Sequence, residues 1–131
     1  ILLKVSPDLS HQQLDEIIEY CLRSGIDGLV AGNTTRSRDG ITSISKEKIE
    51  EIGNGGMSGA PLHQKNLELV KYVHTKSEGK LPIIGVGGIM SPEQAKAMLD
   101  AGASLVEIYT GFIYEGPALV KNIIKHLETT L

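Results

Sequence analysis

The chain has 131 residues, of which 40% are hydrophobic and 22% charged, and its formal net charge is −3. This is ordinary globular composition, and the length is enough for one modest domain. The charge gives no general attraction to nucleic acid or to an anionic membrane, and no run approaches the roughly 20 apolar residues of a membrane helix. Because Cys21 is the single cysteine, an internal disulfide is excluded and a reducing compartment is expected.

The first residues form an apolar run, Ile1–Leu3, and residue 1 is isoleucine rather than methionine. No preceding residues shield this run. We therefore expect the chain to be part of a longer protein, or an ordered portion of one. A processed mature terminus is the alternative.

The first quarter of the chain reads as strand, helix and strand. Residues 1–5 predict a strand, and Ser10 with Gln13 three residues later forms a capping box for the helix that follows. Gly25 should end that helix, and residues 28–31 predict the second strand. The helix should bury one face at the i, i+3, i+4, i+7 spacing, formed by Leu14, Ile17, Ile18, Cys21 and Leu22.

A polar stretch of 27 residues, 34–60, follows the second strand and contains five glycines. It includes a short helix candidate at 46–52. Connections of this length are uncommon inside a compact domain and are usually functional. We therefore expect this stretch to contribute to a site.

The rest of the chain repeats the alternation. A helix is expected from about residue 63 to residue 78, where Gly79 ends it, and the apolar residues 82–86 are typical of a strand buried on both faces of a parallel sheet. One face of that helix should hold Leu67, Val70, Val73 and His74. The sequence Ser91-Pro92-Glu93-Gln94 is a strong helix start with a capping box, and Gly102 should end this helix. The last strand and the last helix are expected at 104–109 and 117–129.

Four strand–helix units thus follow one another without a linker, which argues for an α/β fold with a parallel sheet and crossover helices. A closed barrel of this type needs eight units and about 250 residues. We therefore expect residues 1–131 to form half of a (β/α)8 TIM barrel, its C-terminal half. A small open doubly wound sheet is the alternative.

Glycine-rich loops after the last two predicted strands suggest a phosphate site, because barrels often bind phosphate with these loops. Counted back from the C-terminus, the loops are 85–89 and 109–114. Backbone N–H groups at glycines can form an anion-binding nest. The candidate donors are Gly87, Gly88, Tyr109 and Thr110, with the Thr110 hydroxyl as a further group. Glycines after a strand are also common in plain turns, and it is the pairing of two such loops that favours a phosphate site.

Polar residues at two other strand ends are further candidates. Lys4 lies in an apolar strand, where an unpaired buried charge is costly, so it either points inward toward an anion such as a reduced flavin or outward into solvent. Asn33, Thr34 and Thr35 follow the second strand, and their amide and hydroxyl groups suit a polar planar ligand. Asn and Thr are also common turn residues.

The remaining reactive side chains carry weaker signals. The histidines His11, His63, His74 and His126 show no metal-ligand spacing, so no metal is expected. Cys21 falls on an apolar helix face, and Ser58 lacks the strand–turn–helix setting of a nucleophile elbow. No pair of carboxylates stands out, and no catalytic residue is expected within the chain.

Six blocks, in order along the whole chain, resemble dihydroorotate dehydrogenase, most closely its quinone-dependent class 2. They are KVSPDL at 4–9, DG at 27–28, NTT at 33–35, GGMSGAPL at 55–62, PIIGVGGI at 82–89 and AGASLV at 101–106. The resemblance corresponds to the C-terminal half of that enzyme. A different barrel flavoenzyme with the same phosphate site is the less favoured alternative.

The resemblance implies an FMN-containing (β/α)8 barrel that oxidises dihydroorotate to orotate in de novo pyrimidine biosynthesis. It places Lys4 near the flavin ring, and Asn33 and Thr34 at both the flavin and the orotate. The other implied FMN contacts are Gly32, Ser58, Gly59, Leu62, Val86, Gly87, Gly88, Ile108, Tyr109 and Thr110. Relatives often carry threonine where this chain has Gly32, so a side-chain contact to the flavin would be lost there.

The resemblance also places other parts of the enzyme outside the 131 residues. These are the serine that acts as catalytic base, several substrate-binding asparagines, and a helical segment that binds quinone and membrane. It implies hydride transfer to FMN and reoxidation by quinone, in a cytoplasmic enzyme associated peripherally with the inner membrane. The chain alone is therefore expected to be inactive.

Two other functions remain open at this point. The chain can be a module that binds FMN or phosphate without turnover, or a structural assembly. A half barrel exposes two unpaired strand edges and an apolar interior. Its expected partner is the N-terminal half of the barrel, and the isolated chain is expected to pair with a second copy as a homodimer.

Overall fold

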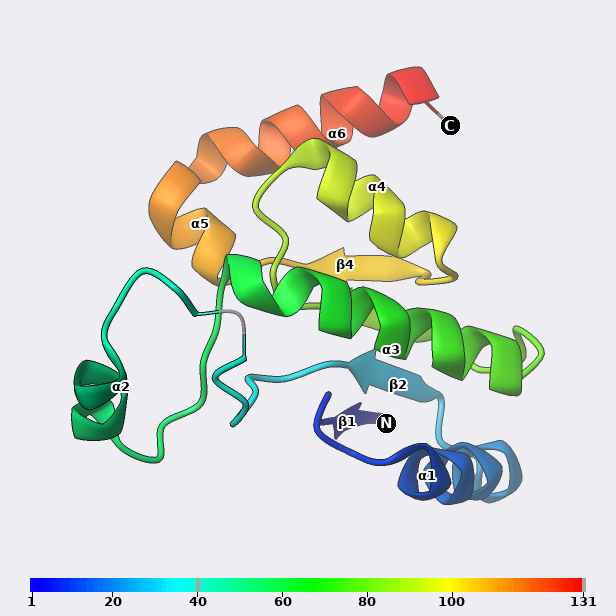
Figure 1. Cartoon of the computed structure of the whole chain (residues 1–131). Coiled ribbons are helices and arrows are strands. Elements are labelled where there is room, and N and C mark those ends of the chain that lie inside the picture. Colours follow the sequence, from blue (N-terminus) through cyan, green and yellow to red (C-terminus); the bar gives the residue numbers. More distant parts are fainter. Residues whose placement is uncertain (40, 131) are drawn as a thin grey trace.

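The computed structural model describes residues 1–39 and 41–130. Four parallel strands form one sheet in chain order: β1 (Leu2–Val5), β2 (Gly28–Ala31), β3 (Ile83–Val86) and β4 (Leu105–Glu107). The helices are α1 (His11–Ser24), α2 (Lys46–Ile52), the 3-10 turn η1 (Ala60–Leu62), α3 (His63–Lys76), α4 (Pro92–Asp100), α5 (Thr110–Glu115) and α6 (Pro117–Thr130). Figure 1 shows this alternation, with α2 projecting from the body on the long connection between β2 and α3.

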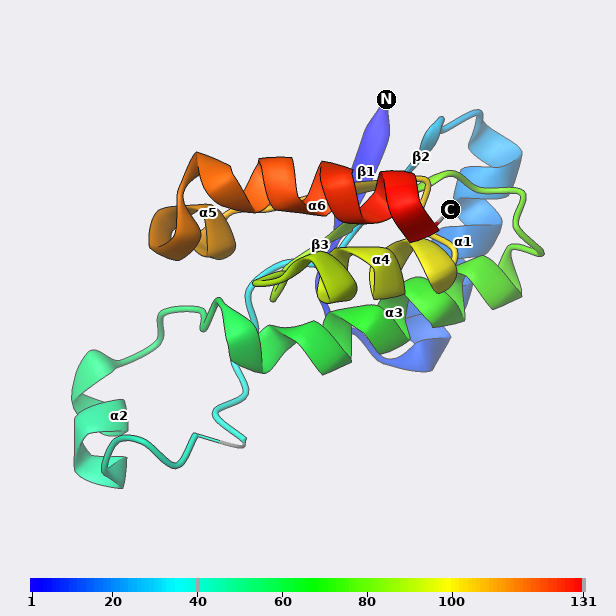
Figure 2. The same ribbon diagram turned by 90° about the horizontal axis from the view of Figure 1, so that it is seen from above.

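The sequential strand order decides between the two architectures that the sequence left open. In a doubly wound sheet the strand order reverses at a switch point. Here every strand pairs with the next one along the chain, so no reversal occurs. Four consecutive helices, α1, α3, α4 and α6, pack each against the next in the same order as the strands (Figure 2). This is the repeat of a (β/α)8 barrel, present four times.

The helices cover one face of the sheet and leave the other open. Side chains that point toward the helices are buried, for example Leu29 and Ile83, which are both 0% exposed. The alternate side chains point the other way, and Leu2 and Leu105 on the two outer strands are 45% and 62% exposed. On this open face, four residues are neighbours across the adjacent strands: Lys4, Val30, Ile84 and Leu105. The open face therefore carries one lysine in a largely apolar row.

The helix termini follow from local sequence. At α1, the Ser10 Oγ accepts a hydrogen bond from the Gln13 N–H at 3.2 Å, and the Gln13 Oε1 accepts from the Ser10 N–H at 2.9 Å, which confirms the capping box. Gly25 ends the helix with a φ of 74°. The α4 start differs in one detail. Ser91 caps it as expected, but the Gln94 side chain accepts from the N–H of Met90 rather than from that of Ser91.

Two predicted helix faces need correction. On α1, Leu14, Ile18 and Cys21 are buried, but Leu22 is exposed. On α3 the buried residues are Asn66, Leu69, Val70 and Val73, whereas Leu67 is only half-buried and His74 is exposed. Asn66 was missed because an apolar pattern cannot reveal a buried asparagine, whereas Leu69 was missed although it is apolar.

Some of the predicted boundaries were wrong, and two short elements were not predicted. The strands are shorter than predicted, beginning at residues 2, 83 and 105 instead of 1, 82 and 104, and β4 ends at Glu107 instead of residue 109. The sequence did not predict η1 or α5. Helix α5 has the sequence TGFIYE, whose glycine, aromatic and β-branched residues are poor helix formers. Its helical state therefore depends on packing against α6.

Candidate functional site

A cavity of about 420 Å³ opens at the C-terminal edge of the sheet. Its wall is built from Lys4 on β1 and from residues at or after the ends of β2, β3 and β4, so parts of the chain that are far apart in sequence meet there. The lining residues are Lys4, Asn33, Thr34, Ser58, Gly59, Leu62, Val86, Gly87, Gly88, Ile89, Glu107, Ile108, Tyr109, Thr110 and Gly111. Parallel strands bring their carboxyl ends to one edge, which is where barrels place their sites.

The structure brings together twelve of the thirteen residues that the sequence indicated as FMN contacts. Lys4 lies on the face of the sheet opposite the helices and lines the cavity, where it is also exposed to solvent. Gly32 is the exception, because it is buried behind the wall, where an added Cβ would lie 2.1 Å from the Oδ1 of Asn66. That the twelve residues bind FMN stays a prediction.

A hydroxyl contact closes one side of the cavity. The Oγ1 of Thr110, the first residue of α5, lies 3.2 Å from the Oγ of Ser58 in the long connection after β2. These residues are 52 positions apart in the chain. Their contact places Gly59 beside Thr110, so two of the segments expected to form the site share one wall.

The loop Gly87–Gly88 packs tightly against the start of α3. Both glycines have positive φ, 107° and 76°, which L side chains rarely adopt. A Cβ at Gly88 would lie only 2.2 Å from the backbone nitrogen of His63. The His63 side chain is half-buried, and burial lowers its pKa below the ordinary value, so the neutral imidazole is favoured. The loop backbone thus lies directly between the cavity and α3.

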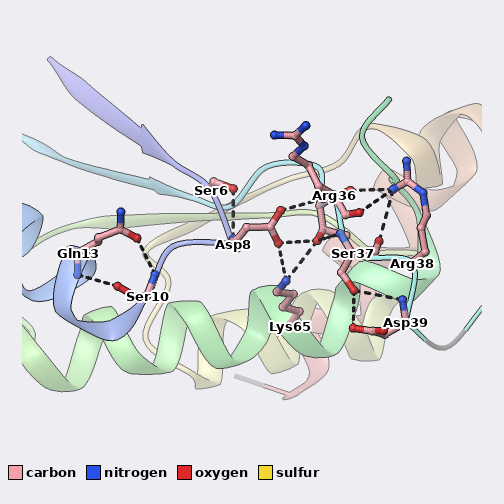
Figure 3. A network of polar contacts seen from close by, with 10 residues as sticks. Ser6, Asp8, Ser10, Gln13, Arg36, Ser37, Arg38, Asp39 and Lys65 are labelled. Atoms are coloured by element: carbon pink, nitrogen blue, oxygen red, sulfur yellow. Dashed lines mark hydrogen bonds and ion pairs between the residues drawn. The ribbon is translucent and has the colours of Figure 1, made fainter. Parts of the chain in front are cut away.

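A polar network around Asp8 holds the loops after β1 and β2 to α3 (Figure 3). The Asp8 carboxylate accepts hydrogen bonds from the Thr35 hydroxyl at 2.5 Å, from the Arg36 N–H at 2.8 Å and from the Lys65 ammonium. Thr35 is buried and turned to Asp8, so it does not face the cavity as Asn33 and Thr34 do. Its role in the structure is to anchor the loop that carries them.

Hydrogen bonds join the two ends of the long connection between β2 and α3 and also link residues within it. Thr35 and Met57 exchange two backbone hydrogen bonds, of 3.1 and 2.8 Å, as an antiparallel bridge. Beyond that bridge, the Arg38 guanidinium donates to backbone carbonyls at both ends of the excursion, including those of Thr35 and Gly55. The bridge therefore sets Asn33 and Thr34 near Ser58 and Gly59, although the connection between them is long.

The network shifts the pKa of Asp8. Burial alone raises the pKa of this carboxyl, but the hydrogen bonds from Lys65, Thr35 and Arg36, together with the Lys65 charge, outweigh burial. The result is a pKa lowered from 3.8 to about 2. Asp8 is therefore ionised throughout the physiological pH range.

Sequence reasoning missed several residues of this region. Glu107 lines the cavity from β4, and the signal for it was present, since it is a charged residue in an apolar strand just as Lys4 is. Asp8 and Lys65 were missed because their partners are far away in the chain. Among residues 1–39 and 41–130, no three His, Cys, Asp or Glu side chains gather as a possible metal site. No helix in these ranges has the length and apolarity needed to cross a membrane.

Comparison with known proteins gives the family. The family model described as "Dihydroorotate dehydrogenase" matches residues 1–131, the whole chain. The chain belongs to the dihydroorotate dehydrogenase family. Curated members named "Dihydroorotate dehydrogenase (quinone)" include one from Christiangramia forsetii, 50% identical over 94% of this chain, and one from Salinispora arenicola, 49% identical over 92%. The chain spans about a third of the length of each, 35% in both cases.

Solved structures of dihydroorotate dehydrogenase agree with this result. The ligand-free enzyme from Eimeria tenella superposes with a TM-score of 0.87 at 34% identity, over 96% of this chain and 34% of that one. The same enzyme in complex with ferulenol gives a TM-score of 0.86. These matches confirm the expected fold class, a partial (β/α)8 barrel.

The Asp8 network makes a prediction about pH. Because the pKa of Asp8 is lowered on folding, its ionised form stabilises the fold above pH 3.8, and this contribution is lost as the pH falls toward about 2. We expect Asp8→Asn to lower the urea midpoint at neutral pH and to leave it unchanged near pH 2. Glu19→Gln, at an exposed carboxylate on α1, is the control and should have little effect at either pH. Equal losses for Asp8→Asn at both pH values would contradict this account.

The close packing of Gly88 makes a second prediction. Gly88 and Gly25 have nearly the same φ, 76° and 74°, but nothing lies within 4 Å of a Cβ at Gly25. Gly25→Ala should therefore cost only the left-handed strain, roughly 1–2 kcal/mol. Gly88→Ala should cost about 1–3 kcal/mol more, because the His63 backbone cannot move aside easily. Urea unfolding measures both values, and equal losses would show that the contact with α3 is unimportant.

Proposed function

We propose that residues 1–131 are the C-terminal half-barrel of an FMN-binding, quinone-dependent dihydroorotate dehydrogenase. This enzyme oxidises dihydroorotate to orotate in de novo pyrimidine biosynthesis. The observation that carries the proposal is the cavity, which collects residues from five separate stretches of the chain that the family resemblance assigns to FMN. The names of the curated relatives, which include quinone, support the same electron acceptor.

The donor set of the cavity fits FMN. Its volume of about 420 Å³ lies within the roughly 300–1,000 Å³ of ligand sites, and the lining combines apolar side chains with a few polar groups. Leu62, Val86 and Ile108 provide apolar surface for a flavin ring. The backbone of Gly87–Gly88 and the start of α5 provide N–H groups for a phosphate, because the first N–H groups of a helix have no intrahelical acceptor.

Each group of residues has a distinct task in this proposal. Bound FMN would supply the hydride acceptor for the oxidation of dihydroorotate. The Lys4 ammonium offsets negative charge at the flavin end of the cavity, and Asn33 and Thr34 donate and accept hydrogen bonds to orient the substrate. The apolar wall excludes water from these contacts. By the family resemblance, the proton of the same reaction is taken by a serine in the remaining part of the barrel.

We further propose that the open face of the sheet packs against that remaining part. Leu2 and Leu105 lie on the outer strands, and their exposure leaves apolar surface to be covered. The quinone and membrane contacts of the whole enzyme belong to segments beyond these residues, in keeping with a cytoplasmic enzyme bound peripherally to the inner membrane. In the absence of the other half, the strand edges of β1 and β4 make a second copy the natural partner.

The cofactor proposal predicts binding that can be measured directly. Titration of FMN into the chain, followed by flavin fluorescence, should show saturable binding, with weaker binding of riboflavin, which lacks the phosphate. Lys4→Ala should weaken FMN binding about tenfold or more, because a charge-assisted hydrogen bond contributes about 1.5–3 kcal/mol. Lys121→Ala, at an exposed lysine on α6, is the matched control and should not change the affinity.

The enzymatic proposal is tested in a chimaera. This chain replaces the matching 35% of the Christiangramia forsetii relative, and dihydroorotate-dependent reduction of a quinone is measured. Turnover is the expected result. A chimaera that folds and binds FMN but does not oxidise dihydroorotate would mean that the chain is a binding module only. A chimaera without FMN would remove the cofactor proposal.

The exposed edges predict self-association of the isolated chain. Light scattering should give about twice the 14.1 kDa chain mass, because pairing of two half barrels covers both free edges and the open apolar face. Leu105→Lys, on the open face of β4, should shift the chain toward monomer. Leu22→Lys, an exposed leucine on the helical side, is the control. A monodisperse monomer at micromolar concentration would rule out the homodimer.

A further inference from the structure

Asn66 is a buried polar residue without a partner. Its side chain, on α3, is 0% exposed, and within the described residues neither its Oδ1 nor its Nδ2 has a hydrogen-bond partner. Buried side-chain polar atoms are hydrogen-bonded in the large majority of cases, since leaving one unpaired costs free energy. An apolar side chain of similar size would fill the same space at a lower cost in free energy. The asparagine therefore has to be explained by the groups around it.

The position of the amide gives that explanation. It lies between the glycines that follow β2 and β3. A Cβ at Gly32 would be 2.1 Å from the Asn66 Oδ1, and a Cβ at Gly87 would be 2.2 Å from its Nδ2. Both distances are far below van der Waals contact, so the amide occupies the space in which either side chain would begin.

The two glycines are not equivalent. Gly87 has a φ of 107°, so its backbone alone favours glycine. Gly32 does not have a positive φ, and nothing in its backbone requires glycine. The side chain of Asn66 is the nearest group to a Cβ there, with Oδ1, Cγ and Nδ2 all within 3.3 Å. The identity of residue 32 is therefore set by residue 66.

This pair lies at the base of the cavity wall. Gly32 directly precedes Asn33 and Thr34, and Gly87 itself lines the cavity. Asn66 thus contacts the first residues of two segments that line the cavity, on the side of those segments that faces α3. We propose that Asn66 is a positioning residue of this cavity and forms one interdependent unit with Gly32. Its amide fills the space of a side chain at position 32 and lies against the backbone at the ends of β2 and β3, so the two residues together fix the position of that backbone. The pairing itself is independent of the ligand, whereas its effect on FMN rests on the proposed function.

A double-mutant cycle tests the pairing. Gly32→Thr should lower the urea midpoint, because the threonine side chain collides with the amide. Adding the smaller residue in Gly32→Thr/Asn66→Ser should recover at least half of that loss. Gly55→Thr is the matched control, since Gly55 also lacks positive φ and a Cβ there meets nothing within 4 Å, and its midpoint should not change. Losses that simply add in the double variant would overturn the pairing, and recovery decides the matter even if Gly32→Thr alone fails to fold.

A second variant separates the volume of Asn66 from its hydrogen-bonding groups. Asn66→Leu keeps a similar volume without polar atoms, so the urea midpoint should stay the same or rise. FMN affinity should nevertheless fall about tenfold if the amide positions the two loops, because leucine has a different shape from the planar amide and would shift the backbone beside it. An Asn66→Leu variant that keeps its midpoint and binds FMN as tightly as the unmodified chain would show that the amide only fills space. If the unmodified chain does not bind FMN, the cofactor proposal fails, while the double-mutant cycle still decides the pairing.

Discussion

The cavity depends on how closely the first turn of α3 approaches the ends of β2 and β3. At Gly88 the backbone meets the backbone of His63, and at Gly32 and Gly87 it meets the amide of Asn66. Each contact is possible only without a Cβ. A helix packed this tightly against two strand ends leaves the loop backbone little freedom. The glycines of the site are therefore required by the packing behind the wall at least as much as by any ligand in front of it.

A second constraint acts on the long connection after β2. Its two ends are joined by the Thr35–Met57 bridge, and Asp8 and Lys65 hold the first end to the body of the molecule. The long connection is thus held in place at both ends and is not a free loop. Because the contact of Asp8 with Lys65 is charge-assisted and partly shielded from solvent, we expect it to be stronger than an exposed surface ion pair such as that of Arg23 with Glu19.

Much of this arrangement could be predicted from the sequence, because glycine and polar residues at strand ends are local signals. Seven residues singled out in this way line one cavity, and the family resemblance added the other five. The alternation of apolar segments predicted the four strands, but their order in the sheet was known only from the structure. The failures have a common cause. Asp8, Lys65 and Asn66 act through partners distant in the chain, and α5 is helical because of its packing rather than its propensity. Composition and periodicity do not carry such information.

The two faces of the sheet differ in how far their side chains are buried. Leu29 and Ile83 are fully buried under the chain's own helices, whereas Leu2 and Leu105 are exposed. In the whole barrel that we propose, the helical side would already be packed within these residues, and the inner layer would be buried only when the barrel closes. On this proposal, a substitution of Val30 or Ile84, on the open face, would alter the fit of the two halves more than the stability of these residues alone.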